Sequence, residues 1–454
     1  MGGAGESSGR PRLAALLSLA WPVVLSRSAQ AVIGFCDALM SAPLGEHALA
    51  ATTTGSLNTV AILILPMGVA FIVQSFAAQL SAKDDMDGAQ RYGWYGVLLA
   101  ALAGLFALAL TPLVPAAIEL TAYSPEVKQL MGGYIELRLL AVAAAVGFEA
   151  IGNWYGGLGN TRMQMAASLV MMVVNVALNA LLIEGRLGFP ALGVEGAALA
   201  SVIATWTGFG VLAVLFWRDA SGSLRAALQP SRVGEFVRML RFGLPHGLNW
   251  FLEFSAFLLF IDVIVAEVGT VTVAAMMVVF QVNSVSYMPS FGLASSGAIL
   301  AGQAVGRDAR DEVPGILRLT MSTAAVWQAT VGLLYLLVPG TIMGWFAPRG
   351  EATPELVSTG ATLLALSAAW QLFDAVAMST GEALRAAGDT AWPMFARLLL
   401  AWIVFLPASY VSVVMWEGGG IAAINCLILY LAMLAAVLVL RFRHGAWRRI
   451  ELTQ

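Results

Sequence analysis

Long apolar stretches alternate with short polar breaks along the whole chain of 454 residues. An α-helix needs about 20 apolar residues to cross a hydrocarbon core about 30 Å thick. Each stretch reaches that length, so each predicts one membrane-spanning helix. The pattern predicts twelve spans, at 13–40, 47–80, 93–115, 126–156, 162–184, 192–217, 236–266, 271–303, 314–345, 354–384, 391–416 and 418–441.

The composition agrees with this pattern. Hydrophobic residues make up 59% of the chain and charged residues 11%, whereas soluble domains carry roughly 25% charged residues. The predicted fold class is therefore an all-α integral membrane protein. The net charge of −3 and the lack of a basic patch argue against a nucleic-acid partner. The three histidines are widely separated and the loops are too short for a catalytic domain, so we expect neither an enzyme nor a cofactor.

The positions of the basic residues predict the orientation in the membrane. Nineteen of the 24 Lys and Arg residues fall at one side of the predicted spans, in the tails and alternate loops. The positive-inside rule then puts both termini in the cytoplasm of a cell whose inner membrane holds the protein. The first ten residues, MGGAGESSGR, are small and polar, and we interpret them as a cytoplasmic tail rather than a signal peptide.

The chain contains an internal repeat. Pro22 recurs as Pro245 and Pro66 as Pro289 at an offset of 223. Gly45 recurs as Gly269 and Asp84 as Asp308 at an offset of 224, and later in the copies Gly159 recurs as Gly388 at an offset of 229.

Each copy holds six spans, an even number, so both copies insert with the same orientation. Parallel repeats of this kind are typical of transporters in which two lobes rock around a central cavity. The predicted organisation is a tail at 1–12, an N-terminal lobe at 13–217, a cytoplasmic linker at 218–235, a C-terminal lobe at 236–442 and a tail at 443–454. We expect this two-lobe protein to act as a monomer in the lipid bilayer.

Two carboxylates stand out in the C-terminal lobe. His246, Asn249 and Glu253 lie on one face of the seventh span, as do Ser367, Gln371 and Asp374 on the tenth. At 1.5 Å per residue, Glu253 and Asp374 lie roughly 18 and 16 Å from the cytoplasmic charges, at a similar depth.

An ionised acid at mid-membrane costs at least about 2.5–3.5 kcal/mol. One interpretation is structural, with each acid paired with Arg or hydrogen-bonded to an amide. No Lys or Arg of this lobe lies at that depth, which favours the other interpretation, a site at Glu253 and Asp374 for a proton or for a metal cation such as Na⁺.

The N-terminal lobe carries a different polar set. Arg27, Gln30, Gly34 and Asp37 share one face of the first span, and Gln30 is the repeat counterpart of Glu253. Asp37 lies roughly 13 Å deep and is a candidate for coupling or substrate binding. Arg27 is either an internal counter-ion or a side chain that reaches toward the interface.

Glu149 is a minor candidate with an ambiguous register. Its surroundings, FEAIG, resemble FDAVA around Asp374, but the offset of 229 pairs Glu149 with Met378 and Ala145 with Asp374. Further polar side chains could line the same cavity or only pack within the bundle. The full set of predicted coupling or substrate-binding residues is Asp37, Gln30, Asn175, Asn179, Asn249, Gln281, Tyr287 and Gln371.

Nearly the whole chain resembles the multidrug and toxic compound extrusion (MATE) transporters, in particular their NorM-like branch. The resemblance rests on the order and spacing of short motifs rather than on any one of them. These are Pro22, Asp37, LGEHALAA at 44–51, GLGNTR at 157–162, VNVALN at 174–179, LGVEGAALA at 192–200, FGLP at 242–245, Glu253 in WFLEF and Asp374 in QLFDA.

The resemblance implies an antiporter in which inward movement of Na⁺ or H⁺ drives export of amphipathic, often cationic compounds. It implies that Glu253 and Asp374 bind the cation and that Asp37 takes part in coupling. Asn175 and Asn179 depart from the family pattern, since other branches place an acid on this helix. An alternative is a flippase for a lipid-linked precursor, which would need a basic cavity, and Arg27 is the only base at mid-membrane.

Overall fold

The computed structural model describes residues 13–121, 123–346 and 353–453, and the described part is helical, with no β-strand. Each of the twelve predicted spans coincides with one helix or with consecutive helices. The all-α membrane fold predicted from the apolar pattern is therefore confirmed. The predicted tail at 1–12 lies outside the described residues.

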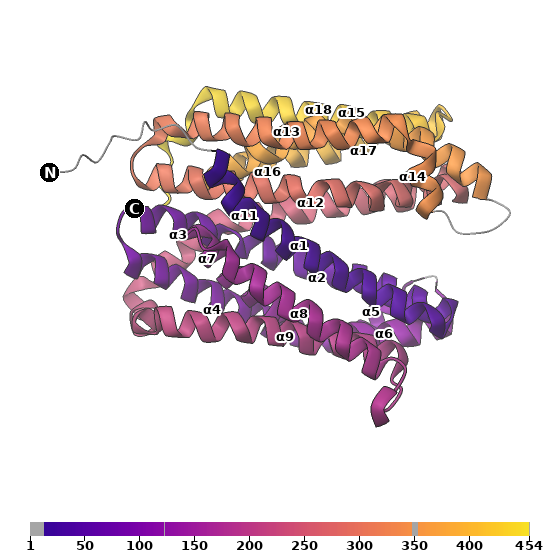
Figure 1. Cartoon of the computed structure of the whole chain (residues 1–454), viewed down its shortest axis with the longest axis horizontal. Coiled ribbons are helices and arrows are strands. Elements are labelled where there is room, and N and C mark those ends of the chain that lie inside the picture. The colour runs from indigo at the N-terminus through magenta and orange to yellow at the C-terminus, as the bar shows by residue number, and fades with distance from the viewer. Residues whose placement is uncertain (1–12, 122, 347–352, 454) are drawn as a thin grey trace. The chain divides into compact units, whose positions relative to one another are not determined.

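The helices belong to two compact units (Figure 1). The first unit comprises residues 22–254, and the second comprises 13–21 with the chain from 255 onward. The helix from Val233 to Leu259 begins in one unit and ends in the other, at a different place from the predicted linker. The lobe boundaries that the repeat predicts stay a prediction.

The first unit contains the larger number of separate helices. They are α1 (Leu13–Ser41, from Pro22 onward), α2 (Glu46–Ala70), α3 (Ile72–Ala82), α4 (Met86–Leu110), α5 (Val114–Glu119), α6 (Pro125–Leu139), α7 (Val142–Gly157), α8 (Thr161–Leu182), α9 (Gly193–Ala220), α10 (Leu224–Ala227) and α11 (Val233–Leu259, up to Phe254). In this unit α7 packs against α2, α3, α4, α8 and α9, so the polar side chains of α7 are central.

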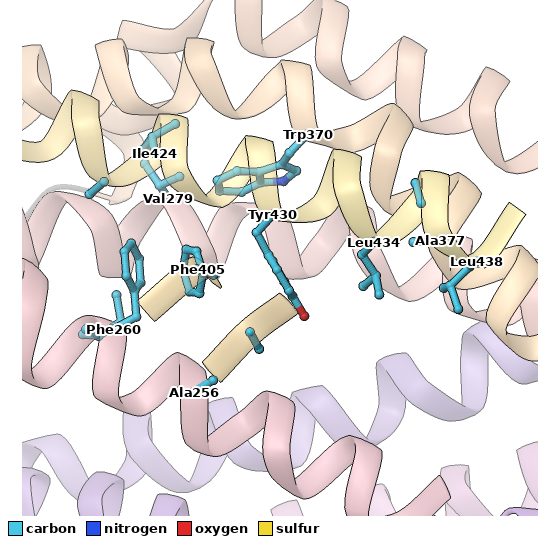
Figure 2. Close-up of a cluster of buried hydrophobic side chains, with 14 of the residues drawn as sticks. Ala256, Phe260, Val279, Trp370, Ala377, Phe405, Ile424, Tyr430, Leu434 and Leu438 are labelled. Atoms are coloured by element: carbon cyan, nitrogen blue, oxygen red, sulfur yellow. The ribbon is translucent and has the colours of Figure 1, made fainter. Parts of the chain in front are cut away.

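The second unit is built around one long helix. Its helices are α12 (Thr270–Gly306), α13 (Val313–Leu337), α14 (Pro339–Phe346), α15 (Thr353–Ala386), α16 (Ala391–Leu398), α17 (Leu406–Tyr410) and α18 (Gly419–His444), with π-helical segments at 260–264, 399–405 and 411–415. The helices α12, α13 and α18 all pack against α15. Figure 2 shows the core between them, where Phe405 lies 4.9 Å from Phe260 and 5.1 Å from Tyr430, measured between ring centroids.

Within the described part of the chain, ten helical segments are long and apolar enough to cross a membrane. The other two predicted spans, 126–156 and 236–266, are not among these segments. The first divides into α6 and α7, of 15 and 16 residues. The second consists of α11 and the π-helical segment that follows it, and it contains His246, Asn249 and Glu253.

The repeat is visible in the backbone of the turns. Gly45 and Gly269 have φ values of 106° and 123°, and Gly159 and Gly388 have 83° and 91°. The pair Asp84 and Asp308 also shares the left-handed region, at 62° and 58°, which few residues other than glycine adopt. The two copies therefore end and begin their helices with the same local geometry.

Small residues let α11 approach α2 closely within the first unit. A Cβ atom on Gly68 would lie 2.7 Å from the Cα of Gly247, and one on Gly247 would lie 2.5 Å from the carbonyl oxygen of Leu65. Gly243 and Gly247 are four residues apart on α11. This is the arrangement by which membrane helices gain van der Waals contact without a hydrophobic driving force.

The polar connection between the copies is folded against the first unit. Trp94 donates its indole N–H to the carbonyl of Ala220 at 2.8 Å, and Tyr155 donates to Asp219 at 2.7 Å. Glu235 accepts hydrogen bonds from Arg91 at 3.0 Å and from Tyr95 at 2.9 Å. The predicted linker is thus attached to α4 and α7 rather than extended.

We expect Gly247→Ala to destabilise the protein, because the new methyl group would press on the α2 backbone. Overpacking of this kind costs roughly 1–3 kcal/mol. Gly210→Ala in α9 is the matched control, since a Cβ there meets nothing within 4 Å and alanine favours the helix by roughly 0.5–1 kcal/mol. Thermal unfolding in detergent measures both, and equal unfolding temperatures for the two variants would contradict the close approach of α2 and α11.

We expect the contribution of Glu235 to stability to depend on pH. Burial raises the pKa of its carboxyl group, but hydrogen bonds from Arg91 and Tyr95 outweigh burial and hold that pKa below its ordinary value. The stabilisation is present above the unfolded-state pKa of about 4.3 and is lost as the pH falls through the lower folded-state pKa.

Glu235→Gln should therefore lower the unfolding temperature at pH 7, and the difference from the parent protein should close as the pH falls below about 4. Glu184→Gln is the control, because its carboxylate pairs with Arg186 at an exposed turn. A difference for Glu235→Gln that stays constant from pH 7 to pH 3 would contradict this role.

Candidate coupling and substrate site

The polar face predicted on the first span faces the interior of the first unit. Gln30, Gly34 and Asp37 of α1 line a cavity of about 420 Å³ together with Glu149 of α7 and Trp250 of α11. Most of the remaining wall is apolar, supplied by residues such as Met67, Phe148 and Met171. The cavity therefore combines two carboxylates and one base, Arg138, with a largely apolar surface, which suits an amphipathic ligand.

Asp37 is held by side chains from two other helices, α8 and α9. It is buried, and its Oδ1 accepts hydrogen bonds from the amides of Asn175 at 3.1 Å and Asn179 at 2.6 Å, both on α8. Its Oδ2 accepts a hydrogen bond from Ser201 of α9 at 2.5 Å. These three donors are neutral side chains, so none of them offsets a charge on the carboxylate.

The same cluster offers oxygen atoms to a cation. Asn179 Oδ1 is buried with no hydrogen-bond partner, while Asn175 Oδ1 accepts only a 3.2 Å hydrogen bond from Asn179 among the contacts described. Together with the Asp37 carboxylate and the Ser201 hydroxyl, these are the hard oxygen ligands that Na⁺ and similar ions prefer. Among the described residues no group of three His, Cys, Asp or Glu side chains could hold a metal ion, so a transition-metal site is not indicated in that part of the chain.

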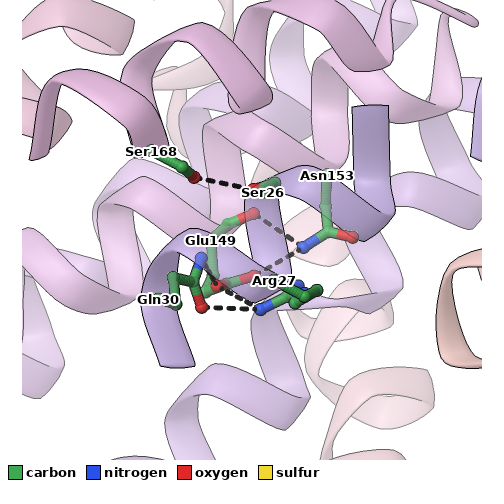
Figure 3. A network of polar contacts seen from close by, with 6 residues as sticks. All are labelled: Ser26, Arg27, Gln30, Glu149, Asn153 and Ser168. Carbon is green, nitrogen blue, oxygen red and sulfur yellow. Dashed lines mark hydrogen bonds and ion pairs between the residues drawn. The ribbon is translucent and has the colours of Figure 1, made fainter. Parts of the chain in front are cut away.

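The second carboxylate on the cavity wall is paired with a base (Figure 3). Arg27 donates to both oxygens of Glu149, at 2.7 and 2.8 Å, and its guanidinium lies 5.1 Å from the centre of the Phe71 ring. Gln30 and Asn153 also donate to the carboxylate, at 3.5 and 3.3 Å. The sequence left two roles open for Arg27. These contacts show that Arg27 is an internal counter-ion and that its partner is Glu149.

A second cavity lies in the second unit. It has a volume of about 240 Å³ and is lined by the predicted residues Asp374, Gln371 and Tyr287 beside the stacked rings of Phe280 and Trp370. Gln371 donates to Asn283, and Ser286 contacts the amides of both Gln328 and Gln371. A chain of neutral polar groups therefore runs along one side of this cavity.

The remaining predicted residues have different surroundings. Glu253 lies on an exposed position of α11 at the end of the first unit, and Asp374 belongs to the second unit, so their pairing stays a prediction. Asn249 is buried, and Gln281 is exposed on α12, outside the residues that line the cavity.

Sequence reasoning missed several members of these networks. Asn153 lies four residues after Glu149 on α7 and Asn283 four residues before Tyr287 on α12, so helical spacing from those candidates could have found both. Ser201 and Gln328 lie on α9 and α13, which carry no predicted site residue, and the only signal for Gln328 is an amide inside an apolar helix.

Ser201→Ala should destabilise the protein, since it leaves Asp37 Oδ2 buried without its donor. Loss of one partner of a buried charged group costs about 1–3 kcal/mol. Thr207→Ala on the same helix is the control, because that exposed hydroxyl bonds to the Ile203 carbonyl of its own helix and its loss should stay within about 0.5 kcal/mol. Thermal unfolding compares the two, and the same small effect for both would argue against a hydrogen bond that holds Asp37.

Comparisons with known proteins agree with this architecture. The family model MatE matches residues 22–181 and 245–411. A protein named probable multidrug resistance protein NorM from Chromobacterium violaceum is 30% identical over 86% of this chain and 84% of its own length. One of the same name from Thermotoga maritima is 25% identical over 96% and 93%, and multidrug resistance protein PmpM from Pseudomonas aeruginosa is 25% identical over 88% and 84%.

Solved structures share the fold over 96% of the chain. A transporter of the MOP superfamily from Pyrococcus furiosus superposes with a TM-score of 0.87 at 19% identity, covering 96% of its chain. A multidrug resistance MATE family transporter in an outward-facing conformation superposes with a TM-score of 0.85 at 18% identity, also over 96% of its chain. With the family model matching most of the chain, the protein belongs to the MatE family of membrane transporters, which are not enzymes, and is NorM-like.

Proposed function

We propose that this protein is an antiporter that exports amphipathic cationic compounds across the inner membrane, driven by inward movement of Na⁺ or H⁺, with both termini in the cytoplasm. The observation that carries the proposal is the buried carboxylate of Asp37 on the wall of an apolar cavity. The multidrug resistance names of the NorM and PmpM relatives support the same substrate class.

The proposed coupling follows from the cost of charge in a bilayer. An uncompensated carboxylate at mid-membrane is disfavoured by at least about 2.5–3.5 kcal/mol, so the cavity favours either a small cation or a cationic substrate beside its acids. The coupling cation and the cationic substrate compete for the same negative charge. If the protein reorients only when that charge is neutralised, it carries the cation in one direction and the substrate in the other. This competition produces antiport without a chemical reaction.

The roles proposed for the acids differ. Glu253 and Asp374 bind the coupling cation, as their depth, the repeat and the family resemblance suggest. Asp37 couples cation and substrate within the first unit, where Asn175, Asn179 and Ser201 hold it. The flippase alternative requires a basic group in the cavity. Arg27 is paired with Glu149, but Arg138 also lines this cavity, so the transport test has to separate the two functions.

The test is ethidium transport in proteoliposomes with independently imposed Na⁺ and pH gradients. We expect the parent protein to respond to at least one gradient. Glu253→Gln, Asp374→Asn and Asp37→Asn should each reduce gradient-driven transport by about tenfold or more, which corresponds to about 1.4 kcal/mol or more of lost cation binding.

Asp262→Asn is the matched control, because this acid is nine residues from Glu253 on the same span and is exposed near its outer end. It should transport like the parent protein. Undiminished transport in all three test variants would overturn the proposal. Binding of a lipid pyrophosphate without any response to ethidium would favour the flippase.

A further inference from the structure

The Arg27–Glu149 pair has the geometry of an occupied cation site. The guanidinium contacts both carboxylate oxygens, at 2.7 and 2.8 Å, and the exposed fractions of the two side chains are 13% and 1%. Gln30 and Asn153 supply two more donors to the same carboxylate. Glu149 thus has a positive charge and amide neighbours around it, inside the membrane (Figure 3).

The internal repeat relates this place to the predicted cation site. At the offset of 223, Gln30 corresponds to Glu253 and Arg27 to Trp250, and at the offset of 229 Ala145 corresponds to Asp374. In the first unit, Gln30 and Ala145 line one cavity.

Glu149 lines the same cavity, four residues from Ala145 and so on the same face of α7, one helical turn away. The first copy therefore keeps one carboxylate at this place, moved by one turn, and carries an arginine where the second copy has a tryptophan.

A tethered cation behaves differently from a free one. The Arg guanidinium stays protonated at all physiological pH values and cannot leave the protein, so the charge it neutralises is not exchanged during transport. Breaking such a buried pair leaves an uncompensated charge in the protein interior, which makes displacement by Na⁺ or H⁺ unfavourable. The carboxylate of Asp37 differs, because neutral groups hold it.

We infer that Arg27 is a built-in counter-ion that occupies the first copy of the cation site and thereby limits the number of cations exchanged per substrate. This inference rests on the proposed cation coupling. Removing the guanidinium leaves Glu149 in need of an exchangeable cation. The variant gains one coupling cation rather than only losing a structural contact.

The experiment measures the ratio of cation to ethidium at static head, in proteoliposomes with the membrane potential clamped at zero. The ethidium and cation gradients that balance there give the number of cations exchanged per ethidium, independent of the turnover rate. Arg27→Leu should raise this ratio by one. Arg27→Lys keeps a tethered charge and should leave the ratio unchanged, and Arg27→Leu combined with Glu149→Gln should return it to the parent value.

The ratio for Arg27→Leu tests the role of Arg27, and the ratio for the parent protein tests cation coupling. An unchanged ratio for Arg27→Leu would overturn the inference while leaving cation coupling intact. A parent protein whose ethidium gradient is balanced by neither cation would overturn the proposed function itself.

Arg27→Leu could also fold without transporting. Equilibrium binding of ²²Na⁺ and proton uptake by the purified full chain then decide the question. One more cation per chain than in the parent protein is expected, and an equal number would overturn the inference.

Discussion

A carboxylate inside a bilayer must have its charge compensated within the protein, because no water is there to do so. The first unit meets this constraint at two places along α1. Arg27 of α1 supplies a full positive charge to Glu149 of α7, and the donors described at Asp37 of α1 are neutral. The first arrangement is fixed in charge, whereas the proposed coupling requires a ligand to change the charge at the second.

Both arrangements also determine how α1 is held. The spacing of Arg27, Gln30, Gly34 and Asp37 puts them on one face, which meets α7 at Glu149 and meets α8 and α9 at Asn179 and Ser201. In the proposed coupling, a change of charge at Asp37 acts on the contacts to α8 and α9. The Arg27 contact to α7 does not involve that carboxylate, so the proposal gives α1 one constant attachment and one that responds to the ligand.

How much of this was predictable depends on whether a feature repeats along one helix. The polar face of α1 repeats at three and four residues, and it was predicted in full. The partner of Arg27 was not predicted. Two alignments of the internal repeat place Glu149 differently, and only the packing of α7 against α1 decides between them. Isolated groups such as Ser201 and Gln328 gain their meaning from a neighbouring helix, which a pattern along one helix does not contain.

Helix breaks show the same limit. The long apolar stretch at 126–156 predicts one span, but the structure divides it after Leu139 although neither proline nor glycine stands at the break. The turns between spans are easier to predict from the sequence, because glycines and aspartates stand where the backbone needs positive φ values. Sequence therefore predicts where spans end better than where they bend.

The duplication separates what the fold requires from what transport requires. Turn pairs such as Gly159 and Gly388 have the same backbone geometry in both copies, since any other residue would strain the turn. The interior pairs differ instead, with Gln30 opposite Glu253 and Arg27 opposite Trp250 in the repeat. A symmetric pair of ionised sites would double the charge that the bilayer interior must compensate, so the asymmetry lowers that cost. In the proposed mechanism, the copy that carries Glu253 is then the one that exchanges its cation.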